Sequence, residues 1–401
     1  MECLFFRRND SLVISARSVR GRVVGAVAAI FFAGVAIPAR ADAQAADAPR
    51  AADAQTVAIA RGWSALAKGE LAPAAAAAQE AVSASPRSVA ALALLVEVDI
   101  ARAGALAALD DYERWMGAKR VDPPYVLRRI ALAYLQSGAR EPKLGPARTD
   151  ALRALVNEGD PEAIASVTEQ GAKAGPAELE MMAAKGDQRS VHELIELLRV
   201  QPSRMTTINA LVNSGSQLAV QPLMGILSSP RDEERAAAAE GLAKLGAQQA
   251  LERIKPLLQD ASFTVRVAAA AALYRLGDNS GAPLLEEMLT SEHAGLRLSA
   301  AQGLSVRPGG SWLDVARVLT GDPDEAVRLG AARLVAPYDR ELAERTLTQL
   351  QQSGNLAIRE EAGRAIVERV ANDFGTLRRM LRSADPGTAV RAAGRILELT
   401  R

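Results

Sequence analysis

The sequence contains almost no cysteine, histidine or aromatic side chains. Its 401 residues include one cysteine, Cys3, and two histidines, and only 3% are aromatic. A chain with one cysteine forms no internal disulfide, so packing alone must stabilise it. The HExxH, P-loop and GxSxG motifs are absent as well, and we expect no catalytic residue, metal site or cofactor.

The chain also lacks a charge of one sign. It carries 48 basic and 47 acidic side chains. A general nucleic-acid binder is expected to show a basic excess on the whole domain. We therefore expect no nucleic acid among its partners.

Residues 1–41 have the composition of a secretory signal peptide. Several arginines precede an apolar run at 23–37, and Ala39 and Ala41 form a small-x-small cleavage pattern. The run is shorter than the roughly 20 residues that span a membrane. We expect cleavage after Ala41 and a periplasmic or secreted protein with no integral membrane span; a retained anchor is the alternative. Cleavage would remove Cys3 and leave 42 basic and 45 acidic side chains, a net charge of −3.

Two segments follow the signal. Residues 42–55 have mostly short side chains and a low-complexity sequence, which predicts a flexible linker. Residues 56–140 predict paired helices in which small residues and helix breakers recur at tetratricopeptide offsets. These residues are Gly62, Gly69, Ala74, Ala81 and Pro86. Residues 56–140 therefore resemble tetratricopeptide repeats, although most of the aromatic packing residues of that family are replaced by alanine.

An arginine recurs at a fixed spacing through the second half of the chain. The spacing is 31 residues five times and then 32. Each arginine opens a predicted helix, and an aspartate stands six residues before three of them. The arginines are Arg204, Arg235, Arg266, Arg297, Arg328, Arg359 and Arg391, and the aspartates are Asp260, Asp322 and Asp385. A fixed period of this length predicts an array of stacked structural repeats.

The repeats resemble HEAT repeats of the short kind found in bilin-lyase-like proteins. The resemblance rests on the turn aspartate, the Val-Arg pair and the following alanines, as in Asp260, Val265, Arg266 and 268–272. It extends over residues 141–401. It implies an all-α fold, a right-handed α-solenoid (α/α superhelix) of stacked antiparallel helix pairs. It also implies that the arginines and aspartates form a structural ladder between repeats.

The resemblance places the second helix of each repeat on the concave side of the array. The position five residues after the repeated arginine changes from acidic through neutral to basic along the chain. It is occupied by Glu240, Ala271, Gln302, Arg333 and Arg364. A stripe of this kind is usually an ordinary solvated surface; the functional interpretation is that it binds an extended acidic peptide.

These patterns favour an exported, non-catalytic scaffold that binds other proteins or peptides on its concave surface. The alternatives are a bilin-lyase-like enzyme or cofactor chaperone, and a structural tether of a cell-envelope complex. The last predicted helix, at 389–400, carries Ile396, Leu397 and Leu399 without a polar capping unit. Its apolar face needs a cover, which is either the preceding repeat, a partner, or a second copy in a homo-oligomer.

Overall fold

The computed structural model of the protein describes residues 48–117, 122–169, 174–199, 204–307 and 310–401. The expected signal peptide lies outside them. The all-α prediction is confirmed, because regular structure within these ranges is entirely helical. None of the described helices is both long and apolar enough to cross a membrane. The chain divides into two compact units, at Ile130 and Ala131.

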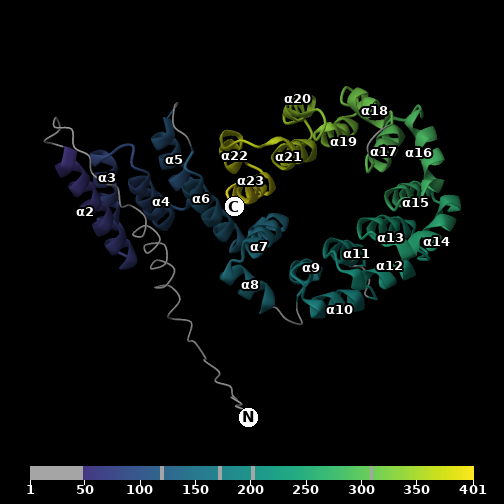
Figure 1. Ribbon diagram of the computed structural model, residues 1–401, viewed down its shortest axis with the longest axis horizontal. Coiled ribbons are helices and arrows are strands. Elements are labelled where there is room, and N and C mark those ends of the chain that lie inside the picture. Colours follow the sequence, from purple (N-terminus) through teal and green to yellow (C-terminus); the bar gives the residue numbers. More distant parts are fainter. Residues whose placement is uncertain (1–47, 118–121, 170–173, 200–203, 308–309) are drawn as a thin grey trace, which may run out of the picture. The chain divides into compact units, whose positions relative to one another are not determined.

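The first unit is built from antiparallel helices that pack in chain order (Figure 1). They are α2 (Ala48–Ala67), α3 (Leu71–Ala84), α4 (Val89–Ala103), α5 (Ala105–Met116) and the beginning of α6 (Pro124–Ala139). Gly62 allows α2 to approach α4, because a Cβ there would lie 2.4 Å from the Leu94 side chain. Residues 48–55 belong to α2, so this part of the expected flexible linker is helical.

The second unit is a two-layer array of helix pairs. Odd-numbered helices lie on its inner side and even-numbered helices on its outer side (Figure 1). The inner helices are α7 (Pro146–Glu158), α9 (Pro176–Ala184), α11 (Arg204–Asn213), α13 (Asp232–Lys244), α15 (Phe263–Arg275), α17 (Ala294–Leu304), α19 (Glu325–Val335), α21 (Leu356–Ala365) and α23 (Pro386–Leu399). The outer helices are α8 (Pro161–Thr168), α10 (Gln188–Leu197), α12 (Val220–Ile226), α14 (Leu251–Ile254), α16 (Ala282–Leu289), α18 (Trp312–Leu319), α20 (Arg340–Leu350) and α22 (Phe374–Leu381).

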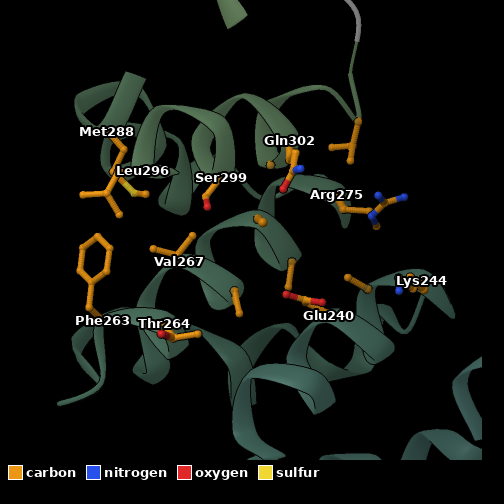
Figure 2. Close-up of a pocket in the computed structure, with 16 residues that line it drawn as sticks. Glu240, Lys244, Phe263, Thr264, Val267, Arg275, Met288, Leu296, Ser299 and Gln302 are labelled. Carbon is orange, nitrogen blue, oxygen red and sulfur yellow. The ribbon is translucent and has the colours of Figure 1, made fainter. Parts of the chain in front are cut away.

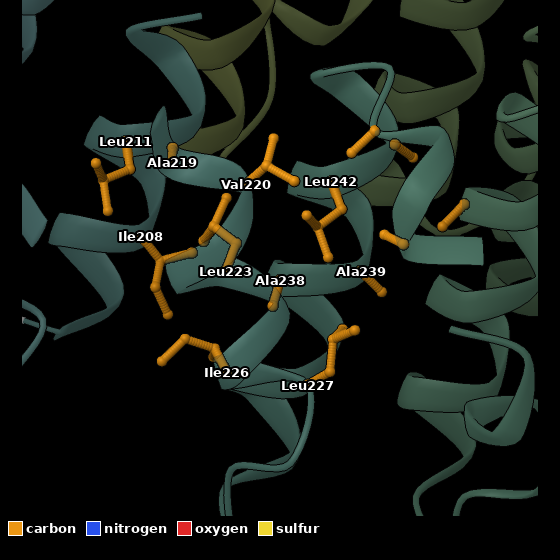
Figure 3. Packing of buried hydrophobic residues seen from close by; sticks show 14 of the residues in the cluster. Ile208, Leu211, Ala219, Val220, Leu223, Ile226, Leu227, Ala238, Ala239 and Leu242 are labelled. Atoms are coloured by element: carbon orange, nitrogen blue, oxygen red, sulfur yellow. The ribbon is translucent and has the colours of Figure 1, made fainter. Parts of the chain in front are cut away.

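Small residues set the spacing of the inner layer, and leucines from both layers fill the space between. In the core around α11, α12 and α13, Leu211, Leu223 and Leu242 are fully buried (Figure 3). A Cβ on Gly241 would lie 2.3 Å from the Val212 side chain. Close approach of the backbones therefore replaces the large aromatic side chains that the sequence lacks.

The array closes on itself. The last helix, α23, packs against α22 and α21 and also against α7, the first inner helix. Arg391 lies 3.2 Å from Asp150 of α7, and the terminal Arg401 pairs with Glu158 at 2.6 Å. Residues Ile396 and Leu397 are buried.

The cover of the last helix thus comes from the start of the same array, in addition to the preceding repeat. The sequence predicted the preceding repeat, a partner or a second copy, because it gave no sign that α7 lies beside α23. The apolar face that suggested a homo-oligomer through the C-terminal helix is covered within the chain, apart from the partly exposed Leu399.

Candidate functional site

Five of the repeated arginines make the same contact inside their own repeat. Each donates Nη1–H to the backbone carbonyl six residues earlier, in the turn before its helix, at 2.6–2.8 Å. The pairs are Arg235 with Ser229, Arg266 with Asp260, Arg297 with Ser291, Arg328 with Asp322, and Arg359 with Ser353. The arginine therefore fastens the turn to the second helix, a contact for which the constant six-residue offset was the signal.

Contact with the next repeat is less regular than the resemblance implied. Arg235 donates two hydrogen bonds to the Asp260 carboxylate, at 2.9 and 2.7 Å, and these bonds hold the pKa of Asp260 below its ordinary value. Arg297 lies 3.9 Å from Asp322. A serine, Ser291, occupies the same place one repeat after Arg266. A ladder arginine thus meets the turn aspartate of the next repeat at Arg235 and Arg297.

The remaining ladder residues take other partners. Arg204 pairs at 3.4 Å with Glu234, which is fully buried and accepts a bond from Ser229. Asp385 pairs with Arg364. Arg391 of α23 pairs with Glu368 and with Asp150. Arg391 therefore contacts α7, the first inner helix, whereas Arg235 and Arg297 contact the next repeat.

Three of the five stripe positions meet in one cavity. Glu240, Ala271 and Gln302 line a space of about 360 Å³ between α13, α15 and α17 (Figure 2). Small side chains on α15 and α17, including Ala271 and Gly303, leave this room. Because the three positions are equivalent in successive repeats, the period itself places them side by side.

The cavity has an apolar end and a charged end, as Figure 2 shows. The apolar end is formed by Phe263, Val267, Met288 and Leu296, and Phe263 is 38% exposed. The charged end is formed by Glu240, Lys244 and Arg275. Lys244 and Arg275, which the sequence did not single out, stand in the last turns of α13 and α15.

The charged side chains of the cavity have no partner in the described part of the chain. Glu240, Lys244 and Arg275 form no hydrogen bond or ion pair there, and all three are exposed. The repeated arginines beside them are all fastened to turns or carboxylates. These three groups are therefore available to a ligand.

Arg333 and Arg364 lie in a different environment. Arg333 pairs with Glu361, and Arg364 pairs with Glu361 at 2.6 Å and with Asp385 at 3.1 Å. Both arginine side chains are partly buried, with exposed fractions of 34% and 25%. The carboxylates of the protein already balance their charge, so the basic half of the stripe is an internal network, apart from the cavity.

Among the described residues, no group of histidine, cysteine, aspartate or glutamate side chains is placed to hold a metal ion.

Comparison with known proteins identifies the repeats. A family model of HEAT repeats matches residues 220–305, which include α12 to α17 and the whole cavity except Val306. The HEAT repeats expected from the sequence are confirmed there. The search of curated proteins finds no significant match.

Two solved structures are similar to the chain at low identity. One is the complex of CpcE and CpcF of phycocyanin lyase from Nostoc sp. PCC7120, with 19% identity, a TM-score of 0.33, and coverage of 58% of this chain and 94% of that chain. The other is human deoxyhypusine hydroxylase in complex with glycerol, with 16% identity, a TM-score of 0.31, and coverage of 68% and 98%. At these values they carry no argument about function.

Proposed function

Taking as premise that this helical scaffold contains HEAT repeats at residues 220–305, we propose that it binds a peptide segment of another protein on its inner face. The observation that supports this function is the cavity between α13, α15 and α17, where apolar side chains adjoin three unpaired charges. Apolar contact supplies affinity, and a few placed polar groups supply orientation, in most ligand sites. The rigid stack of helices holds both in place before binding, which reduces the entropy lost on association.

The proposal is binding without catalysis. A nucleophile or general base is usually oriented by a hydrogen bond from a neighbouring side chain. Glu240, Lys244 and Arg275 make no such bond in the described part of the chain. The proposal also includes export, which rests on the composition of residues 1–41. Intact-mass measurement of the protein from an envelope extract tests export: a chain that begins after Ala41 supports it, and a full-length chain confined to the cytoplasm contradicts it.

Selection of peptides tests the binding function. Random peptides displayed on phage are selected against residues 42–401, and the affinities of the recovered peptides are measured by calorimetry. Phe263→Glu places a charge at the apolar end of the cavity and is expected to weaken binding about tenfold or more. The matched control is Val318→Glu on the outer helix α18, since Val318 is 76% exposed and lies outside the cavity. Recovery of no binding peptide, or equal weakening by both variants, contradicts the function.

A further inference from the structure

We infer that the cavity recognises an extended peptide in which a bulky apolar side chain and a carboxylate stand about five residues apart. This inference rests on the proposed function and specifies the ligand of the same site. It follows from the direction of the cavity, its length and its unmatched charge.

The direction is set by the helices that form the walls. Phe263, Val267, Ala271 and Arg275 follow one another at four-residue intervals on α15 and all line the cavity. Residues four apart lie on one face of a helix. The cavity therefore runs along α15, from the apolar side chain of Phe263 in the first turn to the cation of Arg275 in the last.

The length of this row limits the form of the ligand. Phe263 and Arg275 are the two ends of a helix of 13 residues, and a rise of 1.5 Å per residue places them about 18 Å apart. An extended peptide covers about 18 Å in five residues. Spread over this length, a cavity of about 360 Å³ has a mean cross-section of about 20 Å², much less than that of a helix, which is about 10–12 Å wide with its side chains. The space therefore suits an extended segment.

The unmatched charge identifies the second anchor. Lys244 and Arg275 stand in the last turns of their helices, where a cation also offsets the helix dipole. Arg333 and Arg364 occupy the last turns of α19 and α21 in the same way, yet each of them pairs with a carboxylate. Arg333 and Arg364 stand four residues earlier in their repeats than Lys244 and Arg275 do, and the two cations of the cavity pair with no acid in the described part of the chain. A carboxylate of the ligand supplies that acid.

Glu240 restricts where that carboxylate lies. It lines the cavity beside the two cations and is the only acidic side chain among the lining residues. A second acid in the middle of the ligand would approach Glu240 and be repelled. Neutral or basic residues are therefore expected between the apolar anchor and the terminal acid.

Synthetic peptides of fixed composition test the spacing. Each fluorescein-labelled peptide carries one Phe and one Glu in a Ser/Ala background, with Glu either five or two positions from Phe, in both chain orders. Fluorescence anisotropy with residues 42–401 is expected to show about tenfold tighter binding at a spacing of five in one of the two orders. Equal affinity at both spacings overturns the inference.

Variants of Arg275 test the charge. Arg275→Glu is expected to weaken the five-spaced peptide about tenfold and to favour the same peptide with Lys in place of Glu, while Arg275→Lys retains affinity. If Phe263→Glu abolishes peptide binding but Arg275→Glu changes nothing, this inference fails while the proposed function stands. If no peptide binds the inner face at all, the proposed function fails first.

Discussion

The two kinds of ladder arginine predict two different costs of substitution. Arg235 donates three side-chain hydrogen bonds, two to the Asp260 carboxylate and one to the Ser229 carbonyl, and its side chain is 15% exposed. Arg266 donates only to the carbonyls of Asp260 and Ala261, at 2.7 and 3.2 Å. Arg266 also lies over the ring of Phe263 in its own helix, 5.1 Å from the centroid. Arg235→Ala and Arg266→Ala therefore compare an arginine that joins its repeat to the next with one whose contacts stay within its own repeat.

The expected magnitudes follow from what each substitution leaves behind. Arg235→Ala leaves the Asp260 carboxylate, 10% exposed, with the Ser262 amide as its remaining bond, and we expect a loss of about 3 kcal/mol of unfolding free energy. Arg266→Ala leaves carbonyls that water can reach, and we expect a loss of about 1 kcal/mol. The difference of about 2 kcal/mol measures the contribution of the contact between repeats.

Urea unfolding of residues 42–401, followed by circular dichroism, measures both losses. A double-mutant cycle with Asp260→Asn is expected to show strong coupling to Arg235 and weaker coupling to Arg266, which hydrogen-bonds only the backbone oxygen of Asp260 and acts on its carboxylate through space. The lowered pKa of Asp260 adds a sign test. Its contribution is present above the ordinary aspartate pKa and is lost as the pH falls through the lowered folded value. Equal losses for the two alanine variants at neutral pH would refute the reasoning.

Three further predictions concern the closure, a buried carboxyl and two glycines. Asp150→Arg places a second cation beside Arg391, where α23 packs against α7. Calorimetry is expected to show a lower Tm, which Arg391→Asp in the same chain restores. If the second substitution does not restore the Tm, the contact between α7 and α23 is contradicted. Burial, followed by a shared hydrogen bond with a neighbouring aspartate, raises the pKa of Asp99 to about 7, so stability is expected to fall as the pH rises from about 4 to 7; Asp99→Asn flattens this profile, and a flat profile for the unaltered protein contradicts it. Gly281→Ala places a Cβ 2.5 Å from the backbone of α15 and is expected to lower the free energy of unfolding by about 1–3 kcal/mol. Gly295→Ala in α17 meets open space and is expected to raise the free energy of unfolding by about 0.5–1 kcal/mol. Urea midpoints that shift in the same direction would contradict the comparison.

The sequence by itself determined the features that are local and repeated. The fixed spacing of the arginines predicted the second helix of each repeat, and these helices are α11, α13, α15, α17, α19 and α21. It also placed Glu240, Ala271 and Gln302 in register, because equivalent positions of stacked repeats are neighbours by construction. The all-α class and the HEAT repeats were predicted from the resemblance carried by the turn aspartate, the Val-Arg pair and the following alanines.

Only the tertiary structure decided which charges are occupied and where the array ends. Arg333 and Gln302 hold the same place in their repeats, but Glu361 neutralises Arg333, while the charged side chains of the cavity pair with no group in the described part of the chain. The closure joins Arg401 to Glu158 across 243 residues, a separation that no 31-residue period encodes. The physical reason is common to both: a repeat fixes the contacts between adjacent units, whereas the partner of a charge and the meeting of two ends depend on packing summed over the whole array.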